Sequence, residues 1–74
     1  MINSVILMRV QAGKAKAALD AVKKFKEVKT AFLVFGRYDV VAFAELVSLE
    51  AVKELSSKVN AIKEIRSTET LMEG

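Results

Sequence analysis

The sequence predicts an α+β domain with a four-stranded antiparallel sheet and two helices on one of its faces. An internal repeat is the first reason: residues 25–29 (Phe-Lys-Glu-Val-Lys) match residues 62–66 (Ile-Lys-Glu-Ile-Arg), half a chain further on. The second reason is that each copy holds one apolar stripe at helical spacing between two apolar runs typical of strands. Because the chain has only 74 residues, a single domain over 1–74 is expected.

The first half begins with an apolar run over residues 2–10, which predicts a strand. Gly13 separates this strand from the first helix, and a second strand follows over residues 28–35. The apolar stripe of the helix has spacings of three and four residues. Its members are Ala15, Ala18, Val22 and Phe25.

The second half repeats this order with strands over residues 40–47 and 65–72. Ser48 is a good N-cap for the intervening helix, and Glu50 follows in the first turn, where the helix dipole favours an anion. The stripe of this helix consists of Val52, Leu55, Val59 and Ile62. Two β-α-β units joined by a hairpin over residues 36–39 predict the ferredoxin-like arrangement.

Both faces of the predicted sheet are apolar. Strand 40–47 places Val40, Ala42, Ala44 and Leu46 on one face, and Val41, Phe43 and Val47 with Glu45 on the other. In strand 28–35, period two places Val28, Phe32 and Val34 on one face and Ala31, Leu33 and Phe35 on the other. Two helices cover only one face, so we expect a homodimer in which two sheets stack about a two-fold axis.

The small size of the chain also favours an oligomer. A chain of 8.1 kDa buries only about 62% of its surface on folding. It has no cysteine for disulfides, yet 53% of its residues are hydrophobic.

Catalysis is not expected. The absence of His and Cys excludes zinc fingers, redox motifs, imidazole acid–base chemistry and thiol nucleophiles. The sequence has no Gly-rich phosphate loop, and we predict no cofactor and no metal. Residues 35–39 (Phe-Gly-Arg-Tyr-Asp) contain pieces of an RNA-recognition motif, but Asp39 and the aliphatic run after it do not fit. Residues 11–14 (Gln-Ala-Gly-Lys) lack the arginine of an acylphosphatase anion loop.

The charge pattern indicates neither nucleic-acid nor membrane binding. The net charge is +3, and the basic residues concentrate between positions 14 and 37. We interpret them as a solvated helix face, with a nucleic-acid patch as the alternative. The uncharged run of residues 30–36 is too short to cross a bilayer, and no basic segment precedes the apolar run 2–8 as in a signal peptide. We therefore expect a cytoplasmic protein.

Two short segments are candidate ligand sites. In the hairpin Gly36-Arg37-Tyr38-Asp39, glycine allows a ligand to approach the backbone, and Asp39 offers a carboxylate to an ammonium group. Nearby backbone N–H groups could then bind a carboxylate, so the turn suits the head of an amino acid. Thr68 and Thr70 share one face of the last strand and could donate hydroxyl hydrogen bonds. The alternatives are a plain turn with an Asp that accepts local backbone hydrogen bonds, and ordinary strand threonines.

These residues resemble the effector-binding domain of the leucine-responsive/asparagine-responsive (Lrp/AsnC) regulators, known as the RAM domain. Residues 36–41 (Gly-Arg-Tyr-Asp-Val-Val) match the Gly-x-aromatic-Asp signature of that family, and residues 65–70 (Ile-Arg-Ser-Thr-Glu-Thr) match its C-terminal signature. The resemblance covers nearly the whole chain. It differs in one respect: Met1 leads directly into the first strand, so we expect no DNA-binding helix-turn-helix domain.

The resemblance implies a non-enzymatic, amino-acid-binding module that dimerises through its sheet and assembles into rings of eight or ten subunits. It implies effector binding between subunits, with Gly36, Tyr38 and Asp39 at the site and a less secure role for Thr68 and Thr70. Co-assembly with full-length regulators would then modulate transcription without direct contact to nucleic acid. Two alternatives remain open at this point: a small dimeric ferredoxin-like enzyme of the monooxygenase type, and a purely structural oligomer.

Overall fold

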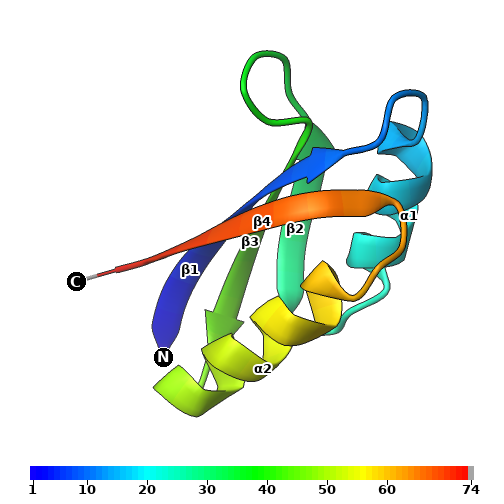
Figure 1. The fold of residues 1–74 in the computed structure, drawn as a ribbon. Coiled ribbons are helices and arrows are strands. Elements are labelled where there is room, and N and C mark those ends of the chain that lie inside the picture. The colour runs from blue at the N-terminus through cyan, green and yellow to red at the C-terminus, as the bar shows by residue number, and fades with distance from the viewer. Residues whose placement is uncertain (74) are drawn as a thin grey trace.

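The computed structural model describes residues 1–73 and contains six elements in the predicted order (Figure 1). The elements are β1 (Ile2–Val10), α1 (Ala15–Lys23), β2 (Val28–Leu33), β3 (Val40–Leu46), α2 (Leu49–Asn60) and β4 (Ile65–Met72). The β-α-β-β-α-β prediction is confirmed, and the two middle strands end one or two residues earlier than their apolar runs.

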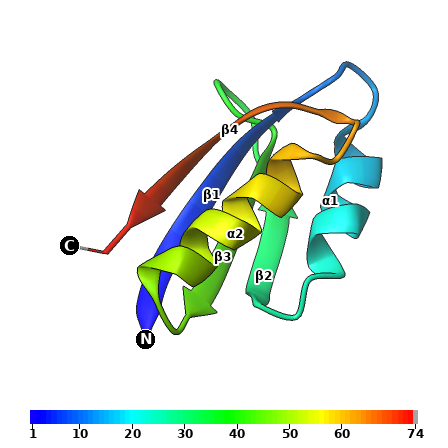
Figure 2. The ribbon, with the colours of Figure 1, turned by 60° about the horizontal axis from the view of Figure 1, so that its bottom comes forward.

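The four strands form one antiparallel sheet in the order β2-β3-β1-β4. Each half of the repeat contributes one central and one edge strand, so the two halves interlock. Both helices lie on the same face of this sheet (Figure 2). The ferredoxin-like fold is thus confirmed. No helix within residues 1–73 is long and apolar enough to cross a membrane.

The hydrophobic core lies between the sheet and the helices. The central strands contribute Ile6, Met8 and Val40, whose exposed fraction is at most 1%. The predicted helix stripes face them, with these buried members: Ala18, Val22, Val52, Leu55 and Val59. Alternating residues of the two central strands and the stripes of the two helices therefore form the core on one side of the sheet.

A buried hydroxyl interrupts this core. Ser4 is 3% exposed, and its Oγ has no hydrogen-bond partner in the part of the chain that the structure describes. Its strand neighbours are Ala44 and Met72, and the only side-chain acceptor between them is the weakly accepting thioether of Met72. A buried hydroxyl without a partner costs stability, so we expect Ser4 to destabilise this layer.

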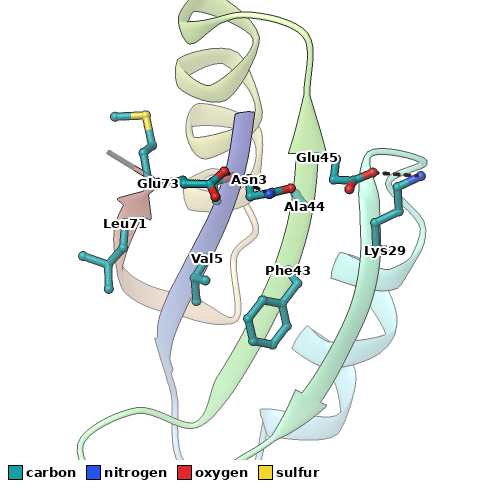
Figure 3. A pocket seen from close by; sticks show the side chains of 10 residues that line it. Asn3, Val5, Lys29, Phe43, Ala44, Glu45, Leu71 and Glu73 are labelled. Atoms are coloured by element: carbon teal, nitrogen blue, oxygen red, sulfur yellow. Dashed lines mark hydrogen bonds and ion pairs between the residues drawn. The ribbon is translucent and has the colours of Figure 1, made fainter. Parts of the chain in front are cut away.

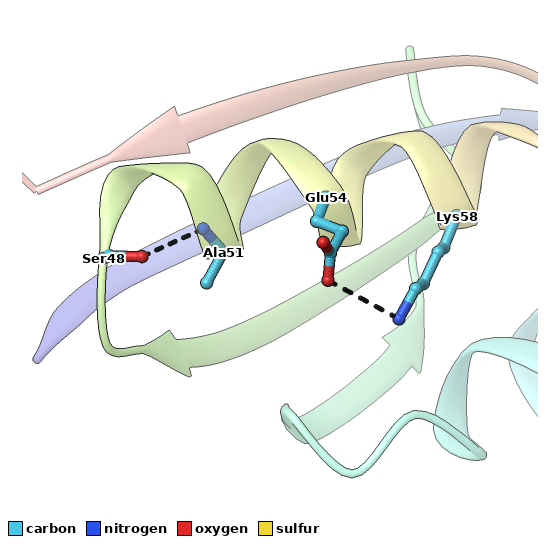
Figure 4. A network of polar contacts seen from close by, with 4 residues as sticks. All are labelled: Ser48, Ala51, Glu54 and Lys58. Atoms are coloured by element: carbon cyan, nitrogen blue, oxygen red, sulfur yellow. Dashed lines mark hydrogen bonds and ion pairs between the residues drawn. The ribbon is translucent and has the colours of Figure 1, made fainter.

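The ends of the two helices differ. Helix α2 begins at the predicted cap, because the Oγ of Ser48 accepts a hydrogen bond from the backbone N–H of Ala51 at 3.1 Å (Figure 4). Further along, Glu54 and Lys58 form an exposed ion pair at 3.9 Å, which contributes little to stability. Helix α1 follows Lys14 without a side-chain cap and has no acidic residue in its first turn.

One predicted face assignment in β2 is wrong. Val28 pairs with Ala44 and packs against the helices, whereas Phe32 pairs with Val41 on the opposite face. The register shifts between Val28 and Thr30, so Lys29 is an extra residue opposite β3. Such a bulge reverses the alternation of side chains, which a strict period of two cannot anticipate.

The other face of the sheet is not covered by any element of residues 1–73 (Figures 1 and 2). We call it the open face, and its apolar members are Val5, Leu7, Phe32, Val41, Phe43 and Leu71. The rings of Phe32 and Phe43 lie 5.9 Å apart and are 43% and 39% exposed. The prediction of two apolar faces with helices on only one is confirmed.

Candidate functional site

The β2–β3 hairpin projects from one end of the sheet (Figure 1). The backbone N–H of Val34 donates to the carbonyl of Asp39 at 3.0 Å and closes the loop. Gly36 has a φ of +125°, a conformation that side-chain-bearing residues rarely adopt. A Cβ at this position would meet no atom within 4 Å, so the glycine leaves open space above the loop.

Asp39 attaches the hairpin to β1. Its Oδ2 accepts a hydrogen bond from the backbone N–H of Val10 at 2.9 Å, and its own N–H donates to the carbonyl of Met8 at 2.8 Å. The first bond occurs where the pairing of β1 with β4 shifts register, between Arg9 and Val10. Asp39 therefore satisfies a backbone donor at the end of a central strand, and this role does not depend on a ligand.

Tyr38 extends from the hairpin to the edge strand. Its hydroxyl donates to Oε1 of Glu69 in β4. This hydrogen bond, then desolvation and the charge of Glu69, raise the pKa of Tyr38 above its ordinary value of 10.0. The guanidinium groups of Arg37 and Arg9 act in the opposite direction, because their positive charges favour the phenolate. The phenol is a neutral hydrogen-bond donor over the physiological pH range.

A small hollow lies beside this hairpin. It has a volume of about 240 Å³ and is lined by Arg9, Gly36, Arg37 and Tyr38. The polar groups of its lining are two guanidinium groups and one phenol, so its wall is positively charged. We call this cavity the hairpin hollow.

Thr68 and Thr70 lie on the other side of the sheet. They pair with Met8 and Ile6, which face the helices. The two threonines thus share a face, as predicted, and the Oγ1 of Thr70 lies 2.7 Å from the Oγ of Ser56 in α2. The structure brings Gly36 and Tyr38 together at the hairpin hollow. Asp39 bonds to β1 and does not line the hollow, and neither Thr68 nor Thr70 lies there.

The sequence prediction of the site did not include Arg9, Arg37 or Glu69. Arg37 is within the hairpin motif itself, whereas Arg9 lies near the end of the apolar strand β1 and Glu69 lies among the polar residues of β4. Once strand pairing is known, alternation puts Glu69 beside Leu7 and Arg9 two residues further along the same face. Charged residues at open-face positions near the hairpin were the signal that could have identified them.

A second hollow lies on the open face, at the end far from the hairpin (Figure 3). It measures about 450 Å³, and Val5, Phe43 and Leu71 point into it from three neighbouring strands. Polar pairs surround these apolar side chains: Asn3 donates to Glu73 at 2.9 Å, and Lys29 lies 3.9 Å from Glu45. Within residues 1–73, no three acidic side chains gather in a way that could hold a metal ion.

Known proteins of similar sequence and structure support a common family. Residues 3–72 match the model of the Lrp/AsnC ligand binding domain. The structure of the hypothetical protein PHS023 from Pyrococcus horikoshii is 29% identical, with a TM-score of 0.92 over 100% of this chain and 90% of that one. No protein with curated annotation matches significantly.

Larger regulators contain the same fold as part of their chains. Escherichia coli AsnC is 28% identical, with a TM-score of 0.88, and the match covers 97% of this chain but 50% of AsnC. A transcriptional regulator from Neisseria meningitidis, NMB0573, was solved with L-Met; it shares 17% identity and a TM-score of 0.85 over 99% of this chain and 49% of its own. With the family model matched over nearly all its residues, the chain belongs to the Lrp/AsnC ligand-binding domain family.

Proposed function

We propose that this protein is a non-enzymatic effector-binding module that senses an amino acid and works as an oligomer. The observation that carries the proposal is the hairpin of residues 36–39, which in a ligand-binding family is hydrogen-bonded to β1 through Asp39 and lies beside a small polar cavity. The volume of the hairpin hollow, about 240 Å³, lies below the range of drug-sized pockets and suits a metabolite of amino-acid size. The neisserial regulator with bound L-Met is a relative in fold that binds such a ligand.

In this proposal, Gly36, Tyr38 and Asp39 form the effector site. Gly36 allows close approach to the backbone, and the Tyr38 hydroxyl and Asp39 carboxylate give the polar contacts. Thr68 and Thr70 are secondary contacts. They lie on the edge strand β4, so a ligand held between this edge and a neighbouring subunit would have access to them.

We further propose that the open face forms the dimer interface. The half-exposed rings of Phe32 and Phe43, together with Val5 and Leu71, give a continuous apolar surface that would be covered by the same face of a second copy. Lys29 and Glu45, which lie 3.9 Å apart, place both charge signs on this face, which allows a two-fold packing without net repulsion.

Dimers would assemble further into rings of eight or ten subunits, with the effector between them. An effector that bridges subunits shifts the equilibrium between dimers and rings only to the extent that it binds one of these states more tightly than the other. The chain spans about half the length of AsnC, so co-assembly with full-length regulators through the same interfaces would connect effector binding to transcription. We place this activity in the cytoplasm.

The test is a thermal-shift screen of the twenty amino acids against the wild type and Asp39→Asn. The asparagine Oδ1 can still accept the Val10 N–H bond, so this variant removes the charge and keeps the anchor. We expect at least one amino acid to raise the melting temperature of the wild type and to do so less in the variant. A screen without any hit, or with hits that are equal in both proteins, would contradict the proposal.

A further inference from the structure

The lining of the hairpin hollow indicates the charge of its ligand. Two of the four lining residues, Arg9 and Arg37, carry permanent positive charges, and neither Tyr38 nor Gly36 offsets them. Both arginines line the same hollow of about 240 Å³ as Tyr38. None of the lining residues carries a carboxylate.

The carboxylates nearest to this cavity already accept hydrogen bonds from the chain. Asp39 accepts from the backbone N–H of Val10, and Glu69 accepts from the hydroxyl of Tyr38. Neither forms an ion pair within 4.0 Å with Arg9 or Arg37 in residues 1–73. The two guanidinium groups are therefore free to bind an external anion.

A zwitterionic amino acid with a neutral side chain has one carboxylate for these two cations. We propose that the hairpin hollow selects a ligand with two carboxylates, the class of acidic amino acids, with Arg9 and Arg37 as its specificity-determining residues. Each guanidinium presents paired N–H donors that match the two oxygens of a carboxylate. The phenol occupies Oε1 of Glu69, and in this proposal the other carboxylate oxygen, Oε2, accepts the α-ammonium group.

This inference rests on the proposed amino-acid sensing and adds the class of effector. It also assigns a ligand role to a residue of β1 that lies outside both sequence signatures. Arg9 lies two residues after Leu7 on the open face, so it brings a cation from a central strand to the turn of residues 36–39. Sites on strands hold their geometry better than sites on loops alone.

Isothermal titration calorimetry on the assembled wild-type protein tests the inference with two isosteric pairs: L-glutamate against L-glutamine, and L-aspartate against L-asparagine. We expect the acidic member of at least one pair to bind tenfold or more tightly than its amide. Arg9→Gln and Arg37→Gln should each weaken binding of that ligand tenfold or more, whereas Arg9→Lys should recover part of the affinity because the charge remains. Arg66→Gln is the matched control, since Arg66 is an exposed arginine that does not line the hollow.

Equal binding of acid and amide, or unchanged affinity in Arg9→Gln and Arg37→Gln, would overturn the inference. A neutral amino acid that binds in an Asp39-dependent and Arg9-independent manner would overturn it while the proposed sensing function stands. A third probe, 2-oxoglutarate, keeps both carboxylates and lacks the ammonium group. Binding of this acid through Arg9, without binding of any amino acid, would support the dicarboxylate site and overturn amino-acid sensing instead.

Discussion

The two faces of the sheet use the same strands for different purposes. The covered face consists of compact aliphatic side chains such as Ile6 and Val40, which are at most 1% exposed. The open face carries larger aromatic residues, Phe32 and Phe43, which remain about two-fifths exposed. Because side chains alternate along each strand, a single sequence run can stabilise the fold on one side and present an association surface on the other. Substitutions on the two faces should therefore affect different measurable quantities.

The largest effect is expected on the covered face. Leu55 is 2% exposed and belongs to the stripe of α2 that packs on the sheet. Leu55→Ala should lower the free energy of unfolding by about 3 kcal/mol, since it removes buried methyl groups and leaves a cavity. Urea denaturation followed by circular dichroism measures this change. A loss below about 1 kcal/mol would mean that α2 is not part of the core.

Substitutions on the open face should weaken the association between copies of the chain. Phe43→Asp places a charge at the centre of the proposed interface, where its desolvation is costly, so we expect at least a tenfold weaker dimer by sedimentation equilibrium. The circular dichroism spectrum should retain the wild-type shape. Leu49→Asp is a matched control, because Leu49 is similarly exposed, at 46%, but lies at the start of α2. Equal effects of the two substitutions would argue against the open face as the interface.

A smaller effect on the free energy of unfolding is expected from Ser4 on the covered face. Ser4→Ala removes a buried hydroxyl without a partner and should raise the free energy of unfolding by about 1 kcal/mol. Ser57→Ala serves as a control on the exposed surface of α2, where only helix propensity changes. The denaturant concentration at the midpoint of unfolding measures the change in both variants, provided that the dependence of the unfolding free energy on denaturant is unchanged. A destabilised Ser4→Ala variant would show that the hydroxyl has a bonding role in the folded protein.

The smallest effect concerns the Tyr38–Glu69 contact. Tyr38 is the single tyrosine and the chain has no tryptophan, so phenolate absorbance reports this residue alone. Its raised pKa predicts a titration midpoint above 10.0, and Glu69→Gln should bring the midpoint closer to that value. Since the folded pKa is the higher one, the contact stabilises the fold below pH 10 and loses its contribution as the pH rises through the folded pKa. A midpoint at or below 10.0 in the wild type would contradict the contact.

The sequence predicted the architecture well because its signals are local and repeated. The helix stripes, the cap at Ser48 and the order of the strands follow from spacings within a few residues. The bulge at Lys29 could not be predicted in this way, because an extra residue is defined only against the partner strand. That bulge explains why Val28 and Phe32 lie on opposite faces.

The candidate site was predictable only in part for a similar reason. The hairpin residues are contiguous and form a recognisable motif. Arg9 and Glu69 come from β1 and β4, and only the sheet order brings them near the turn. The placement of Thr70 against Ser56 likewise depends on which face of β4 meets α2, which strand periodicity alone does not fix.

Sedimentation velocity over a series of protein concentrations, with and without the amino acid that gives the largest thermal shift, tests the central claim most directly. We expect species well above the 8.1 kDa of one chain, and a shift of their distribution when the amino acid is added. A single 8.1 kDa species at every concentration, unchanged by any amino acid, would contradict the account of a sheet with one folding face and one assembling face.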